Sequence, residues 1–521
     1  MRPRGFACGL LILLGALPAA AAAATPQPPE KAAADRGLAA VRSFREANAA
    51  RILADFSDLL SLPNVMGDRP NIAKNVAWLR TAFEKRGAKL AVWEPPGEGS
   101  PVLFGRLDTP GAKRTLGVYV HYDGQPVDRE SWTSPPFSPT LRSAALENGG
   151  QPLPLPKPGE RIDPEWRLYA RSAGDDKAPL IAVLTALDAL KQAKIPLTSN
   201  LLFLFEGEEE HGSDHLEAFL TSHKNQLKVD AWLFCDGPVH TSRRPQLVFG
   251  VRGVVDMDLT VYGAVRHLHS GHYGNWAPNP AFALAHLLAS MKDEEGHVQI
   301  ESFYDTVEPL GPAERAAIEA IKDNDDELRK ELGLVETEDN NARLQERLLL
   351  PTLNIRGLLS GSVGQTAENI IPATASASIE LRLVKGNDPS HMLDLLEEHI
   401  RKQGYFIVRE DPDMATRLAH ARIAKVVRHP GYPAARTAMD LDIVFQIVQA
   451  TSRAAGENII LLPTLGGSLP LYLFNDLLAQ PAVIVPIANH DDKQHGPDEN
   501  LRLANLWYGI DLMGELLSMP K

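Results

Sequence analysis

Asn200-Leu-Leu-Phe-Leu-Phe205 runs directly into Glu206-Gly-Glu-Glu-Glu-His-Gly-Ser213. A continuous apolar run of this kind is typical of a strand buried on both faces, as in a parallel sheet covered by helices. The glutamates then lie where the edge of the sheet meets a loop. Because neighbouring like charges repel and raise one another's pKa, the cluster is unfavourable unless a cation binds to it. The stretch therefore predicts an α/β sheet with a cation site at the carboxyl end of one strand.

Strands and helices alternate around this stretch. Leu116–His121 and Ala231–Cys235 read as further apolar strands, and Ala178–Lys194 carries leucine and isoleucine at the three- and four-residue spacing of a helix. A later strand is expected at Ala482–Ile487 and a last helix at Leu503–Leu517. This alternation predicts a doubly wound α/β domain.

The pattern changes near Val251. Val255–Val261 and Ala375–Val384 alternate apolar and polar residues, which is typical of half-exposed antiparallel strands, and the α/β character resumes after about Arg428. We therefore predict a catalytic domain built from residues 25–250 and 429–521, interrupted by an inserted α+β domain at residues 251–428. Within the insertion, one helix is expected over Pro312–Leu332.

The composition excludes some classes of function. The 521 residues carry a formal net charge of −13, and Lys and Arg form no dense stripe. An acidic balance of this kind argues against general nucleic-acid binding.

The N-terminus has the pattern of a cleaved signal peptide. Arg2 and Arg4 precede the apolar stretch Leu10–Leu17, and the alanine run Ala19–Ala24 follows. The apolar stretch is too short to span about 30 Å of hydrocarbon, so no stable membrane anchor is expected. These features predict a signal peptide at residues 1–24 and a periplasmic or secreted protein.

With Cys8 removed, Cys235 is the remaining cysteine, so no intramolecular disulfide is expected.

Other polar residues follow the predicted strands. His121 and Asp123 end the strand that starts at Leu116, and alternation points both side chains to one face. The carboxyl edge of such a sheet is where ligands bind. Asp175 precedes a helix, where it can cap the helix N-terminus or bridge two cations. Asp236 follows the strand Ala231–Cys235, in a position that also suits a simple turn.

Histidines near the C-terminus complete the set. His495 lies in the loop after Ala482–Ile487, and His490 competes with it as a ligand. Of the pair Glu209 and Glu210, one can bind a cation while the other handles a proton. Five candidate ligands and one spare glutamate thus lie at or near the ends of predicted strands, which indicates a hydrolase with two metal ions.

The chain also resembles a known family in several short motifs. These are His121-Tyr-Asp-Gly-Gln-Pro126, Asp175-Asp-Lys177, His269-Ser-Gly271 and Gly466-Gly-Ser468. They resemble motifs of the co-catalytic zinc metallopeptidases, which include cytosolic non-specific dipeptidase, carnosinase, aminoacylase and glutamate carboxypeptidase. The resemblance runs from about Ala39 to the C-terminus, and the dipeptidase branch is the most similar.

This resemblance implies a role for each residue of the metal site. His121 and Asp236 would bind one ion, Glu210 and His495 the other, and Asp175 would bridge both. Asp123 would support His121 from behind, and Glu209 would be the general base. The implied cofactor is a pair of divalent metal ions, Zn²⁺ by default, with Mn²⁺ or Co²⁺ possible.

The resemblance also implies a substrate site and a dimer. Arg382 would hold a substrate carboxylate, and Gly467 and Ser468 would line the same site. His269, on the inserted lid and dimerisation domain, would reach the active site of a partner chain in a homodimer. His211, Ala178, Asn275 and Asp498 depart from the family pattern, but none of them is a predicted ligand or base.

Three functions fit these features of the sequence. The first is a peptidase that cleaves dipeptides or short peptides with a free C-terminal carboxylate. The second is an amidase of the same fold that cleaves N-acyl amino acids, and the third is a binding protein without catalysis. A nucleophilic serine hydrolase is disfavoured because the sequence around Ser270, Ser362 and Ser468 lacks the Gly-x-Ser-x-Gly pattern.

Overall fold

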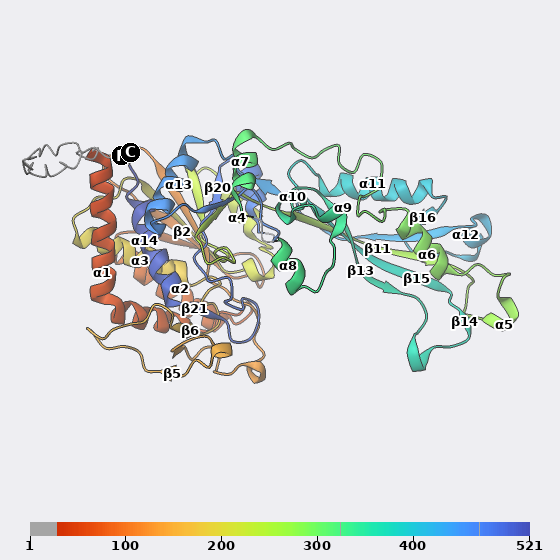
Figure 1. The fold of residues 1–521 in the computed structure, drawn as a ribbon, viewed down its shortest axis with the longest axis horizontal. Coiled ribbons are helices and arrows are strands. Elements are labelled where there is room, and N and C mark those ends of the chain that lie inside the picture. Colours follow the sequence, from red (N-terminus) through yellow and green to blue (C-terminus); the bar gives the residue numbers. More distant parts are fainter. Residues whose placement is uncertain (1–28, 323–324, 468, 521) are drawn as a thin grey trace, which may run out of the picture.

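Two sheets form the framework of an elongated molecule (Figure 1). The computed structural model describes residues 29–322, 325–467 and 469–520. A large sheet and its helices form one end of the molecule, and a five-stranded sheet forms the other. The predicted α/β fold class with an α+β insertion is confirmed.

The large sheet is mixed and has eight strands. In spatial order these are β1 (Lys89–Trp93), β2 (Val102–Leu107), β7 (Asn200–Glu206), β3 (Thr115–His121), β8 (Ala231–Phe234), β20 (Ala482–Ile484), β9 (Gln246–Val248) and β19 (Ile460–Leu462). The four central strands β7, β3, β8 and β20 are parallel to one another. Their carboxyl ends therefore meet at one edge, as the apolar runs predicted.

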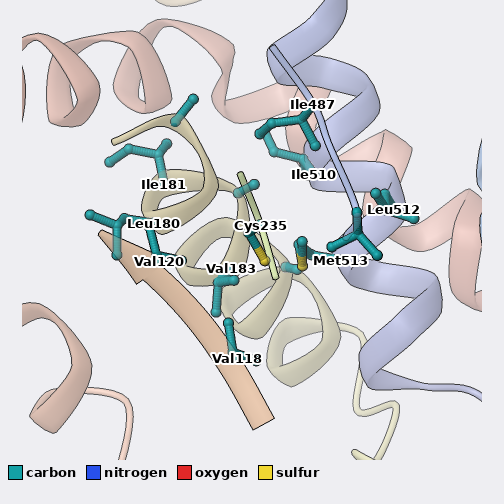
Figure 2. Close-up of a cluster of buried hydrophobic side chains, with 14 of the residues drawn as sticks. Val118, Val120, Leu180, Ile181, Val183, Cys235, Ile487, Ile510, Leu512 and Met513 are labelled. Carbon is teal, nitrogen blue, oxygen red and sulfur yellow. The ribbon is translucent and has the colours of Figure 1, made fainter. Parts of the chain in front are cut away.

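Helices cover both faces of this sheet. One face packs against α1 (Pro29–Leu60), α2 (Arg69–Glu84), α3 (Ala178–Gln192), α13 (Asp442–Ala455) and α14 (Leu503–Leu517). The other face packs against α4 (Leu216–His223) and the short π-helix η5 (Leu473–Leu477). Figure 2 shows Cys235 among the apolar side chains of the first layer, including Val183 and Met513. Cys235 is therefore a core residue, and its thiol is not a member of either candidate ligand group.

The inserted part is the region around the five-stranded sheet. Its strands, in spatial order, are β13 (Thr352–Leu359), β15 (Thr374–Leu383), β11 (Gly253–Tyr262), β17 (Ile423–Arg428) and β16 (Phe406–Val408). Along β11 and β15 every second residue is buried, and the buried residues pack against α6 (Pro280–Ala289) and α11 (Pro389–Lys402). This alternation is the one expected from the sequence. The domain boundaries at residues 250/251 and 428/429 stay predictions.

The described chain also contains a small sheet and several short strands and helices. The small sheet consists of β21 (Asn500–Arg502), β6 (Arg167–Tyr169), β4 (Thr140–Arg142) and β5 (Pro152–Leu153). The short strands are β10 (Gly250–Val251), β18 (Ala435–Arg436), β12 (Leu268–His269) and β14 (Ile370–Ile371). The short helices are α5 (Ser270–Tyr273), α7 (Pro312–Ala320), α8 (Asp325–Glu331), α9 (Glu338–Asn341), α10 (Leu344–Arg347) and α12 (Met414–Ala419).

Two local expectations were wrong. The single helix expected over Pro312–Leu332 is interrupted: α7 ends at Ala320 and α8 begins at Asp325. Ile321, directly after α7, already has an extended backbone, so the helix does not continue past Ala320. The strand expected over Ala482–Ile487 ends at Ile484.

Among the described residues, no helix is both long and apolar enough to cross a bilayer.

Candidate metal centre

His121 stands at the carboxyl end of β3, at the centre of the large sheet. Its side chain is fully buried, and its Nδ1 atom lies 3.4 Å from Oδ1 of Asp123. The other carboxylate oxygen of Asp123 accepts a hydrogen bond from the backbone N–H of Glu210 at 3.1 Å. Asp123 thus touches both His121 and the glutamate loop that follows β7.

Asp175 lies between two histidines. Its Oδ1 atom is 2.7 Å from Nε2 of His121, and its Oδ2 atom is 3.2 Å from Nε2 of His495. Asp175 is not the N-cap of α3, because that position is Lys177. The capping alternative is therefore excluded, and both carboxylate oxygens face candidate ligands.

The candidate ligands form two groups. His121, Glu209 and Asp236 offer ligand atoms that all lie within 4.8 Å of one another, and Asp175, Glu210 and His495 do the same. His495 Nε2 is 3.2 Å from Oε2 of Glu210. The competing His490 belongs to neither group and faces Asp491 instead, with Nδ1 and Oδ1 3.5 Å apart.

The electrostatics of the two groups favour cations. Burial opposes a charge on His121, yet hydrogen bonds to Asp123 and Asp175 raise its pKa well above the ordinary value. Hydrogen bonds to Asp175 and Glu210 raise the pKa of His495 to about 10. Burial, together with the charge of Asp175, raises the pKa of Asp236 to about 7. Protons thus compensate an excess of negative charge that the side chains themselves do not neutralise.

The donor set fits divalent metal ions. Ligands bind a metal in their deprotonated form, so cations would replace the protons that these raised pKa values retain. Carboxylate oxygens and imidazole nitrogens suit Zn²⁺, Mn²⁺ and Co²⁺. The described residues therefore contain two adjacent groups able to hold a pair of ions.

Two neighbouring glutamates of the same run differ in surroundings. Glu209 belongs to the first ligand group, and burial raises its pKa well above the ordinary value. Glu208 accepts a hydrogen bond from the Ser100 N–H at 2.6 Å and lies 2.8 Å from Nδ1 of His215. Glu208 therefore ties the loop to its flanks, whereas Glu209 lies among the candidate ligands.

Sequence reasoning missed two supporting residues. The side-chain amide of Gln125 donates to Oε2 of Glu210 at 2.8 Å, which fixes the orientation of that carboxylate. Glu499 is fully buried and accepts the backbone N–H of Asp175 at 3.0 Å. Both lie in motifs that the sequence presents, Gln125 four residues after His121 and Glu499 four residues after His495. Their hydrogen-bond partners are not visible in the sequence.

The predicted substrate residues are only partly brought together. Arg252 links Arg382 and Gly467: its Nη2 donates to the Arg382 carbonyl at 3.4 Å and its backbone N–H to the Gly467 carbonyl at 3.3 Å. Ser468 lies outside the described residues. His269, on β12, is exposed and accepts a hydrogen bond from the Gly271 N–H at 3.1 Å. The adjoining α5 lies at the far end of the molecule from the large sheet (Figure 1), so His269 is remote from the two ligand groups of its own chain.

Comparisons with known proteins agree on one family. The model of Peptidase family M20/M25/M40 matches residues 117–519. The Cys-Gly metallodipeptidase of Schizosaccharomyces pombe is 27% identical over 475 residues, covering 88% of this chain and 92% of the relative. The human Beta-Ala-His dipeptidase is 25% identical over 465 residues, covering 85% and 84%. The M20 family metallo-carboxypeptidase Sso-CP2 from Sulfolobus solfataricus has a similar structure, with a TM-score of 0.70 and 27% identity over 90% of this chain and 98% of that one.

The same comparisons contradict the prediction of export. The relatives that match most of the chain include Cys-Gly metallodipeptidases of three fungi, and these matches give no support to a periplasmic or secreted protein. The predicted signal peptide at residues 1–24 lies outside the described residues. A pair of arginines before a short apolar stretch is a weak pattern that a chain can carry without being exported. The prediction of export is therefore wrong.

Proposed function

The chain belongs to peptidase family M20/M25/M40, and on this premise we propose that it is a dipeptidase. It is a metal-dependent peptidase, and the proposed substrates are dipeptides or short peptides with a free C-terminal carboxylate. The main support for the proposal is the position of Asp175, which lies between His121 and His495 where the two candidate ligand groups meet. The names of the relatives, Cys-Gly and Beta-Ala-His dipeptidases, support a dipeptide substrate over an N-acyl amino acid.

We propose that each ligand group holds one metal ion. His121 and Asp236 would bind the first ion, Glu210 and His495 the second, and Asp175 both. The distances of Asp175 to the two histidines, 2.7 Å and 3.2 Å, support a bridging position. Zn²⁺ is the proposed ion, with Mn²⁺ or Co²⁺ as alternatives that the same donors accept.

Glu209 is the proposed general base. Two bound divalent ions would lower the pKa of a water molecule and polarise the scissile carbonyl. Glu209 would take a proton at its carboxylate and deliver it to the leaving amine. Burial raises the pKa of Glu209, which favours the uptake of a proton by this carboxylate and so supports the role. Asp123 would keep the His121 ring oriented for its ion.

Arg382 is the proposed partner of the substrate carboxylate. A guanidinium group can bind a carboxylate through two parallel hydrogen bonds, which fixes the orientation of the peptide. In the structure, Nη2 of Arg382 donates a hydrogen bond to Oε2 of Glu380 at 2.9 Å, and the side chain of Arg382 is partly exposed. Gly467 and Ser468 are proposed to line the same site.

A homodimer is proposed to complete each active site. The remote position of His269 supports its action in a partner chain, where it would stabilise the oxyanion. The edge strand β13 supports a partner as well, because Leu358 and Leu359 are 65% and 70% exposed. Exposed apolar edge strands are seldom left uncovered in stable proteins. The inserted part, with proposed bounds 251–428, would therefore be both lid and dimerisation domain.

A substrate panel tests the proposal. Free dipeptides, including Cys-Gly and β-Ala-His, are compared with N-acetyl amino acids, each with metal present, after chelation and after metal is restored. We expect cleavage of dipeptides that chelation abolishes and metal restores. Preferential hydrolysis of N-acetyl amino acids would contradict the dipeptidase proposal, and activity that survives complete metal removal would contradict the metal-dependent mechanism.

A further inference from the structure

Glu499 is a buried carboxylate that accepts four hydrogen bonds, about the full capacity of its two oxygens. Its Oε2 atom accepts hydrogen bonds from Nη1 of Arg171 at 2.7 Å and from the Ser172 N–H at 2.9 Å. Its Oε1 atom accepts the N–H groups of Gly174 and Asp175, each at 3.0 Å. The side chain has no exposed surface. All four donors belong to the loop that ends in Asp175.

This loop depends on Glu499 because it has no ladder or helix to pair these N–H groups. Buried N–H groups without a partner are costly, so nearly all of them are paired in stable proteins. Ser172 has a left-handed backbone with a φ of 63°, which directs successive N–H groups toward one point. The carboxylate of Glu499 occupies that point.

The same loop packs closely against the chain that carries His495. A Cβ atom on Gly174 would lie 2.7 Å from Oδ2 of Asp492 and 3.4 Å from Cβ of Ala488. No side chain fits at this position without displacing its neighbours. The residue before Asp175 therefore packs closely against the side chain of Asp492, three residues before His495.

We propose that Glu499 is a positioning residue for the metal centre, an inference that rests on the proposed function. Glu499 belongs to neither ligand group and acts through the backbone of Asp175. It lies four residues after His495, so one carboxylate sets the position of the bridging ligand relative to a ligand of the second ion. Its loss changes the spacing of Asp175 and His495 and so weakens the capture of metal.

Glu499→Gln tests this role. A glutamine has one accepting oxygen, and in either orientation its NH₂ group faces two N–H donors. We expect metal affinity, measured by equilibrium dialysis against a Zn²⁺ buffer, to fall by about 10- to 100-fold, the range typical of lost outer-shell partners. The visible spectrum of the Co²⁺-loaded protein should change as well, because it reports the geometry of the ligands.

Glu397→Gln is the matched control. Glu397 is also buried and also accepts hydrogen bonds from arginines, namely Arg401, Arg409 and Arg428, but it lies on α11 in the inserted part. This variant loses stability through the same chemical change and should keep the metal affinity and the Co²⁺ spectrum of the unmodified protein. If Glu499→Gln does not fold, Glu499→Asp retains the charge, shortens the reach, and should give a smaller change in the same direction.

The outcomes separate this inference from the proposed function. If the unmodified protein binds fewer than two ions, the proposed function fails. If it binds two ions and a folded Glu499 variant keeps both their affinity and the Co²⁺ spectrum, the positioning role is wrong. An equal loss of metal affinity in the Glu397→Gln control would also overturn it, since the effect would then follow from lost stability alone.

Discussion

The backbone N–H of Glu210 donates a hydrogen bond to the carboxylate of Asp123 at 3.1 Å. The residue that lies behind His121 on β3 therefore also holds the loop that follows β7. Since these strands are parallel neighbours, the contact fixes two groups of candidate ligands to one edge of the sheet. A change at Asp123 should affect both groups at once.

Asp123→Asn should weaken metal binding without unfolding the protein. An asparagine keeps the size of the side chain but removes the negative charge that orients the His121 ring. We expect a loss of metal affinity of about 10- to 100-fold. Equilibrium dialysis measures it, with circular dichroism as a check on folding. Unchanged affinity in a folded variant would show that His121 needs no support from Asp123.

Glu209→Gln should lower kcat by about 100-fold or more while the metal content is retained. The amide keeps the shape of the side chain but cannot take a proton. Steady-state kinetics and elemental analysis of the same sample test both parts. Glu208→Gln is the matched control, because Glu208 contacts Ser100 and His215 in place of the ligand groups. It should lower stability and leave kcat within a few-fold; the reverse pattern would make Glu208 the base.

The metal-free protein should lose stability as the pH rises. The pKa of His495 is raised from its ordinary 6.5 to about 10, so its contribution is fully present below pH 6.5 and is lost as the pH rises toward 10. Asp236 acts in the same direction at lower pH, because burial raises its pKa to about 7 and its ionisation destabilises the fold. Bound metal favours the deprotonated ligands and should reduce this loss. Melting temperatures of chelated and metal-loaded protein between pH 6 and about 10 test this; parallel curves would contradict it.

Cys235 should be unreactive in the folded protein. Burial raises the pKa of its thiol well above the ordinary value, and only the thiolate reacts readily. A thiol reagent should modify it only after denaturation. Cys235→Ala should keep the full metal content, because the thiol packs among apolar side chains (Figure 2). Rapid modification under native conditions would contradict the burial of the Cys235 thiol in the core.

Subunit mixing tests the proposed dimer. His269→Ala and Glu209→Gln chains should each be nearly inactive alone. After exchange, a mixed dimer would combine an intact Glu209 and an intact His269 in one of its two sites, restoring up to about half of the normal activity. Sedimentation of the unmodified protein gives its oligomeric state. A fully active monomer, or no recovery after verified exchange, would rule out the shared site.

Much of the fold was predictable because its signals are local. The apolar runs at Asn200–Phe205 and Leu116–His121 and the alternation at Val255–Val261 appear as strands in the structure. The strands β9 and β19 were missed because each has only three residues, too few to show a period. Their place in the sheet comes from packing against distant parts of the chain.

The candidate site was predictable only in part, for a related reason. The residue types at strand ends indicated metal ligands, and the family resemblance assigned a role to each. The close approach of Asp175 to His495 cannot be predicted from the sequence. It depends on how two loops that are far apart in the sequence pack together. The role of Glu499 was missed, because three of its four partners are backbone N–H groups that no residue type reveals.

The position of β20 has a consequence for the synthesis of the chain. This strand comes late in the sequence but lies in the middle of the large sheet, between β8 and β9. While a ribosome is still making the inserted part, β8 has no neighbour on that side, and His495 has not yet been made. The second ligand group is therefore incomplete until the loop that carries His495 has been made. A nascent chain that ends before this loop lacks part of the candidate metal centre, whatever has already folded of the large sheet.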